Sequence, residues 1–125
     1  MTRAHHELHY LLDLDGEVMV LDRESNYWVK FRVKVVEVTA DCPHGIRYSL
    51  TLHNRENQRI AGIDNAHEIT VGCGPGRKRS SARDHKHRFA KVTPYKFIDP
   101  GTLITDFWQL VDSVIRELEV ENENS

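Results

Sequence analysis

The chain has 125 residues and a mass of 14.5 kDa, enough for one domain with a single core that needs no disulfide staples. Its composition is 39% hydrophobic and 29% charged, which excludes a disordered, collagen-like or coiled-coil chain. Apolar runs are too short for a membrane span or a signal peptide. Cys42 and Cys73 have no metal-binding spacing. We expect one cytoplasmic domain over residues 1–125.

Charge is unevenly distributed along the chain. Residues 77–96 hold eight Lys or Arg and a single acid, Asp84, whereas residues 97–125 hold one Arg and seven acids. A basic block before an acidic tail, expected over residues 119–125, favours a polyanion-binding site. The alternative is an ordinary solvated loop followed by a charged helix.

Residues 1–66 are predicted to form a strand-rich sheet. The clearest stretch is 27–35, where apolar and charged side chains alternate with a period of two. Short turns separate the predicted strands, and this favours an antiparallel meander. The strands are expected at residues 8–14, 18–21, 27–35, 46–53 and 58–63.

A helix is predicted over residues 99–118. Asp99 can cap it, and Pro100 can occupy its first position, where a missing N–H does no harm. Apolar residues recur at steps of three and four from Leu103 to Leu118, so the helix has an apolar stripe that must pack on another element. The sequence therefore predicts an α+β fold: an antiparallel sheet of about five strands with one long C-terminal helix packed across a face.

Residues 72–83 read as a basic, glycine-rich loop. Three glycines and a proline within five positions exclude a helix or a central strand there. The segment lacks the Gly-Lys-Ser/Thr of a P-loop and the third glycine of a dinucleotide-binding fingerprint. We therefore expect a loop that uses cationic side chains.

Three histidines and two acids flank this loop: Asp64 and His67 before it, and Asp84, His85 and His87 after it. If the ends of the loop meet, these five candidate catalytic residues converge. Because His85 and His87 are two positions apart on an extended segment, they are expected to point to the same side.

Two chemistries suit such a cluster. In the first, two imidazoles act as general base and general acid on RNA, without a metal or other cofactor, while Arg and Lys hold the phosphate. In the second, His67, His85 and His87 bind a divalent metal that activates water. The surrounding cations favour the first, because they repel a metal ion and attract a phosphodiester. Histidines that only shape the mouth of the loop are the structural alternative.

Candidate nucleic-acid-binding residues lie in and after the loop. Cationic side chains can follow a phosphate backbone, and a base can stack on an aromatic ring. The candidates are Arg77, Lys78, Arg79, Arg83, Lys86, Arg88 and Tyr95.

The order of four segments resembles the TumE-like toxins of bacterial toxin–antitoxin modules. The segments are Ile63-Asp64-Asn65-Ala66-His67, Asp84-His85-Lys86-His87, Pro94-Tyr95-Lys96-Phe97-Ile98-Asp99, and Leu103 to Asp106-Phe107-Trp108. The resemblance covers roughly residues 46–115, and its loop between His67 and Asp84 is longer and richer in Gly and Arg than the usual pattern. It implies a toxin with a helix-turn-helix antitoxin as partner, and it is compatible with an action on RNA.

The functional hypothesis is a toxin that binds RNA and cleaves it with the histidine cluster. Two alternatives remain open at this point: a non-catalytic module that binds nucleic acid or a partner protein, and a small metal-dependent hydrolase.

Overall fold

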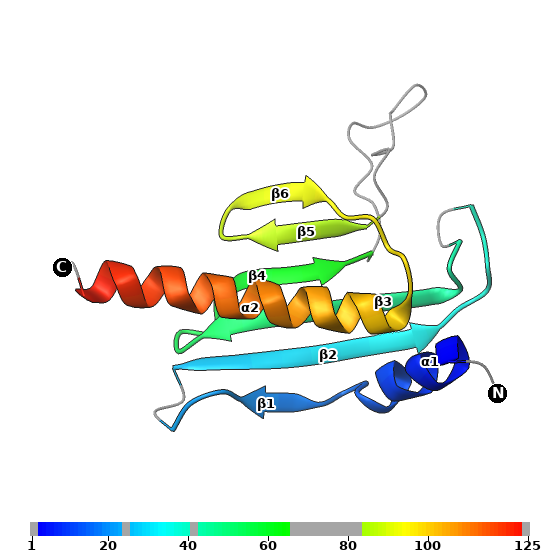
Figure 1. Ribbon diagram of the computed structural model, residues 1–125, viewed down its shortest axis with the longest axis horizontal. Coiled ribbons are helices and arrows are strands. Elements are labelled where there is room, and N and C mark those ends of the chain that lie inside the picture. The colour runs from blue at the N-terminus through cyan, green and yellow to red at the C-terminus, as the bar shows by residue number, and fades with distance from the viewer. Residues whose placement is uncertain (1–2, 24–25, 41–42, 66–83, 124–125) are drawn as a thin grey trace.

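A computed structural model describes residues 3–23, 26–40, 43–65 and 84–123 and shows a six-stranded antiparallel sheet with two helices (Figure 1). The strands lie in the sheet in their order along the chain. The predicted α+β fold is confirmed, with six strands instead of about five. The elements are α1 (Arg3–Asp13), β1 (Val18–Val20), β2 (Tyr27–Val35), β3 (Ile46–Asn54), β4 (Arg59–Asp64), β5 (His85–Arg88), β6 (Lys91–Pro94) and α2 (Pro100–Glu123).

The core lies between the sheet and α2, which runs across one face of it (Figure 1). The period-two pattern of β2 places Val29, Phe31 and Val33 on this face, each at most 1% exposed. Each of these side chains contributes roughly 1.5–3 kcal/mol when it is buried. The face under α2 is called the helix face, and the opposite one the far face. The other buried apolar residues are Leu11, Ile46, Tyr48, Leu50, Leu52, Ala61, Ile63, Leu103, Phe107, Leu110, Val111 and Val114.

Helix α2 begins as predicted and ends later than predicted. The Asp99 carboxylate accepts a hydrogen bond of 2.7 Å from the backbone N–H of Thr102, which is the expected N-cap. The helix continues to Glu123 rather than ending at residue 118. Because no Gly or Pro follows residue 101 and Glu is a good helix former, nothing in the sequence stops the helix at 118.

The prediction of a strand over residues 8–14 is wrong, because residues 3–13 form α1. Leu8, Leu11 and Leu12 all pack on the core, and their spacing of three and four is helical. A short apolar run is ambiguous between a helix and a strand. Gly16, with a positive φ of 85°, therefore joins a helix to β1 instead of closing a hairpin.

Strands β5 and β6 form a hairpin that raises the strand count to six. β5 pairs with β4 on one side and with β6 on the other. Phe89, in the turn between them, has a positive φ of 54°. Within the described ranges, neither helix is long and apolar enough to cross a membrane.

Candidate functional site

The far face of the sheet is polar and carries most of the predicted proton-transfer residues. Its side chains alternate with the core residues of the same strands. α1 and α2 contact each other, and Leu11 of α1 belongs to the core, so both helices lie on the helix face. Reading across β2 to β5, one row of the far face holds Arg32, Ser49, Asp64 and His85, and the next holds Lys30, Thr51, Gly62 and His87.

Asp64 and His87 form the closest pair of this cluster. The Nε2 atom of His87 lies 3.0 Å from Oδ2 of Asp64, and the two side chains are only 14% and 11% exposed. Asp64 ends β4, and His85 of the neighbouring β5 is its cross-strand partner. Of the five residues expected to converge, the structure brings Asp64, His85 and His87 together on the far face.

Arg59 completes the cluster, and the sequence reasoning did not single it out. Its guanidinium lies 3.3 Å from Nδ1 of His87 and 3.9 Å from Oδ2 of Asp64. The register shifts between β3 and β4 at Leu52 and His53. This bulge places Arg59 opposite His53, on the face where it meets His87.

These contacts define the tautomer of His87. A guanidinium has only donors, so Nδ1 of His87 accepts from Arg59, and Nε2 carries the proton and donates to Asp64. Burial lowers the pKa of His87, the charge of Asp64 opposes this, and the charge of Arg59 lowers the pKa again. His87 is therefore a neutral imidazole whose basic nitrogen faces a displaceable cation.

His85 is the second imidazole of the far face. Its ring centroid lies 6.5 Å from that of His87, with the two rings tilted by 49°. Both side chains project to the same side because the residues are two apart in β5, as predicted.

Asp84 does not join this cluster. Its carboxylate is buried and accepts a hydrogen bond from the hydroxyl of Tyr48, a core residue of β3. Burial and this bond raise the pKa of Tyr48, so the phenol stays a neutral donor. Because Asp84 directly precedes His85, the alternation of the strand directs the two to opposite faces. The structure thus separates Asp84 from the histidines with which it was grouped.

Asn65 anchors the end of β4. Its side-chain Nδ2 donates to the carbonyl of Ile46, and its Oδ1 accepts from the backbone N–H of Tyr48, both at 2.8 Å. Asn65 is 6% exposed, and these bonds continue the pairing with β3 beyond the last strand residue. The neighbouring Asp64 is therefore rigidly placed. The only sequence signal was the position of Asn65 inside the Asp-Asn-Ala-His segment.

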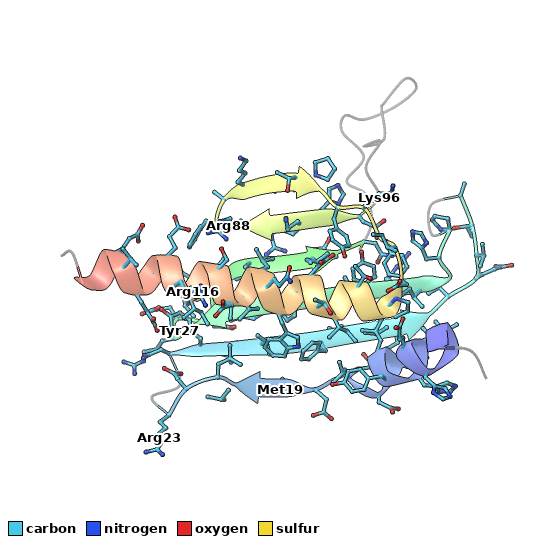
Figure 2. All side chains as sticks on the ribbon, viewed as in Figure 1. Met19, Arg23, Tyr27, Arg88, Lys96 and Arg116 are labelled. Atoms are coloured by element: carbon cyan, nitrogen blue, oxygen red, sulfur yellow. The ribbon has the colours of Figure 1, made fainter. Side chains whose placement is uncertain are left out.

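Three predicted nucleic-acid-binding residues lie on the helix face and not on the far face. Arg88 is paired with Glu117 of α2 at 2.6 Å and donates to Ser113 at 3.0 Å, and Figure 2 shows it beside α2. Tyr95 donates to Asp106 at 2.6 Å. With Lys86, these residues border an open hollow of about 340 Å³. The structure therefore divides the predicted site between two faces of the β5–β6 hairpin.

Several predicted residues fall outside the described part of the chain. They are His67, Arg77, Lys78, Arg79 and Arg83. Their roles stay predictions, including His67 as a third imidazole. Among the described residues, no three His, Cys, Asp or Glu side chains are grouped closely enough to hold a metal ion.

The family model described as Toxin TumE matches residues 19–115, well over half of the chain. No curated protein and no solved structure matches the chain.

Proposed function

Since the chain belongs to the TumE toxin family, we propose that this toxin cleaves RNA at the cluster formed by Arg59, Asp64, His85 and His87. The family makes it the toxin component of a toxin–antitoxin system and implies a cognate antitoxin. The observation that carries the proposal is the buried Asp64–His87 pair, whose geometry leaves Nδ1 of His87 as the basic nitrogen.

The proposed reaction is a transesterification within the RNA strand. Nδ1 of His87 takes the proton of a ribose 2′-hydroxyl, and the 2′-oxygen forms a bond to the adjacent phosphorus. The bond from phosphorus to the 5′-oxygen breaks, and protonated His85 gives its proton to that oxygen. The products are a 2′,3′-cyclic phosphate and a 5′-hydroxyl, so the atoms balance without a metal or a cofactor.

Asp64 and Arg59 would support the two imidazoles. The Asp64 carboxylate holds the ring of His87 in one tautomer and stabilises the imidazolium formed during proton transfer, as a carboxylate does in a catalytic triad. Arg59 has a side chain that is 47% exposed. It can turn from His87 to a phosphate oxygen, where its charge stabilises the transition state.

Replacement of either imidazole tests this mechanism. His87→Asn and His85→Gln should each lower the rate of cleavage of total bacterial RNA by ~10²–10⁴-fold, the range for a positioned base or acid. The matched control is His9→Gln, because His9 is an exposed histidine of α1 and its loss should leave the rate unchanged. Both site variants should also relieve growth arrest in bacteria.

Chelation separates this mechanism from the metal-dependent alternative. Metal-free acid–base cleavage persists in EDTA, whereas a site of His67, His85 and His87 that holds a divalent metal loses activity and regains it with added metal. If the wild-type protein arrests growth but leaves RNA intact under all conditions, the nuclease proposal is wrong and a binding toxin remains.

The finer identity of the partner also belongs to the proposal. We expect the cognate antitoxin to be of the helix-turn-helix type, on the strength of the segments that resemble the family, and we expect the toxin to act in the cytoplasm, where its RNA substrate lies. Co-expression with the neighbouring gene should restore growth and yield a complex on purification. A neighbouring product that neither binds nor protects would contradict this expectation.

A further inference from the structure

The far face of the sheet carries more positive charge than the proposed cleavage cluster uses. Lys30 and Arg32 of β2 and Arg47 of β3 lie on this face. In the part of the chain that the structure describes, none of the three side chains forms an ion pair or a hydrogen bond, whereas the side chain of Lys34 on the same face is paired with Asp15 at 2.7 Å. Unpaired cations gathered on one face form a surface for a polyanion.

The strand register aligns these cations with the cluster. Lys30 shares a row with His87, and Arg32 shares a row with Asp64 and His85. Since neighbouring strands lie about 4.8 Å apart, three strand spacings separate β2 from β5, or about 14 Å. A ligand that reaches from the cations to the imidazoles therefore has to cross the strands.

Small side chains form the floor between the two groups. Thr51 and Gly62 lie between Lys30 and His87, and Ser49 and the buried Asp64 lie between Arg32 and His85. Even a methyl group at Gly62 would lie 2.8 Å from the carbonyl oxygen of Leu50. No long side chain therefore rises from the strands between the two groups.

An aromatic pair borders the same face. Trp28 stacks on His53 with ring centroids 4.0 Å apart and an angle of 10° between the rings. Trp28 is next but one to Lys30 in β2, so it projects from the same face. Cations combined with an aromatic ring on a flat surface are typical of proteins that bind unpaired strands, because exposed bases can stack and phosphates can be neutralised.

We propose that the far face binds single-stranded RNA across strands β2 to β5, with Lys30, Arg32 and Arg47 on the phosphates that flank the cleaved bond. This inference rests on the proposed function and names its substrate class. An acidic protein surface is the competing occupant. RNA is favoured because the cations share their rows with two imidazoles set for phosphodiester chemistry.

The test uses a probe that the protein cannot cleave, a 2′-O-methyl oligoribonucleotide. For each phosphate contact, the logarithm of the binding constant should fall by ~0.7 for every tenfold rise in salt concentration. The triple variant Lys30→Gln, Arg32→Gln, Arg47→Gln should lower this slope by about 2 and leave the melting temperature nearly unchanged, because exposed charges contribute little to stability. The matched control is Arg23→Gln, Lys91→Gln, Arg116→Gln, which removes the same charge at exposed residues outside the far-face rows and should keep the wild-type slope.

Fluorescence then locates the probe on the molecule. Trp108 packs against Phe31 and Phe107 on the helix face, so a Trp108→Phe variant leaves Trp28 as the reporter of the far face. Saturating probe should change the emission of this variant. An unchanged emission, or equal slopes in the far-face triple variant and the wild type, would overturn the proposal.

Two further outcomes separate RNA binding by the far face from protein docking and from the proposed catalysis. A far-face triple variant that still binds the probe but no longer binds the antitoxin would identify the face as a protein-docking surface. This result would overturn the RNA assignment. Because the probe has no free 2′-hydroxyl, its binding does not depend on cleavage. Normal binding together with a failure to cleave natural RNA would overturn only the proposed catalysis.

Discussion

At the scale of single residues, His87 is held between an anion and a cation. Asp64 accepts from one ring nitrogen and Arg59 donates to the other. Each ring nitrogen thus has a defined role before any substrate arrives. Because burial lowers the pKa of His87, the imidazole is neutral and able to accept a proton at neutral pH.

Asp64→Asn should change both the rate and the pH profile of RNA cleavage. An amide cannot stabilise the imidazolium, so the rate at neutral pH should fall by ~10²–10⁴-fold. Since the Asp64 charge raises the pKa of His87, its removal lowers that pKa further. The acidic limb of the kcat/KM profile should therefore move to lower pH, as measured by initial rates between pH 4 and 8. An acidic limb that stays in place or moves to higher pH would contradict the assignment of His87 as base.

At the scale of the elements, the far-face site depends on how β4 fits between β3 and β5. The bulge beside Leu52 and His53 turns Arg59 to the far face, and Asn65 fixes the other end of the strand to β3. Between them, Gly62 allows the backbone of β3 to approach closely. The position of the cluster thus depends on how the backbones of β3 and β4 pack against each other.

Gly62→Ala should destabilise the protein. The new Cβ would lie 2.8 Å from the Leu50 carbonyl oxygen and 3.2 Å from Cγ2 of Thr51, and the first contact is with backbone that cannot yield cheaply. Overpacking of this kind costs about 1–3 kcal/mol, which urea unfolding can measure. Ser49→Ala, on the same face of β3, should stay within about 0.5 kcal/mol of wild type. Equal stabilities of wild type and Gly62→Ala would contradict the close fit of β4 and β3.

The sequence predicted those features that depend on local periodicity. The alternation in residues 27–35 identified the faces of β2, and Asp99 marked the start of α2. The two-residue spacing of His85 and His87 correctly placed both on one face. The prediction of a strand failed at residues 8–14, where a short apolar run is ambiguous between strand and helix and the spacing of Leu8, Leu11 and Leu12 is helical.

Other features of the site depend on pairing between segments and were not predicted. Asp84 and His85 are adjacent in sequence, yet a strand turns them to opposite faces, so a motif treated as one unit was divided. Arg59 reaches His87 because of a bulge that depends on the register with β3. Lys86 and Arg88 were grouped with the basic loop, but strand alternation turns them toward α2.

At the scale of the whole molecule, the sheet separates the hydrophobic core from the proposed RNA site. The helix face contains the core, and Glu117 of α2 and Asp106 pair there with Arg88 and Tyr95. The far face holds the unpaired cations and both imidazoles. The acidic charge that the sequence places after residue 96 thus lies mainly on the side away from the proposed RNA surface, where it does not compete for the cations.

One comparison of substrates tests whether the toxin cleaves RNA through the ribose 2′-hydroxyl. The position of cleavage is first mapped in an RNA transcript, and the same sequence is then prepared with a single 2′-deoxyribose on the 5′ side of the broken bond. In the presence of EDTA, wild-type protein should cut the normal strand and leave a 2′,3′-cyclic phosphate and a 5′-hydroxyl. It should not cut the substituted bond. Cleavage of the deoxy bond, or products that carry a 5′-phosphate, would contradict it.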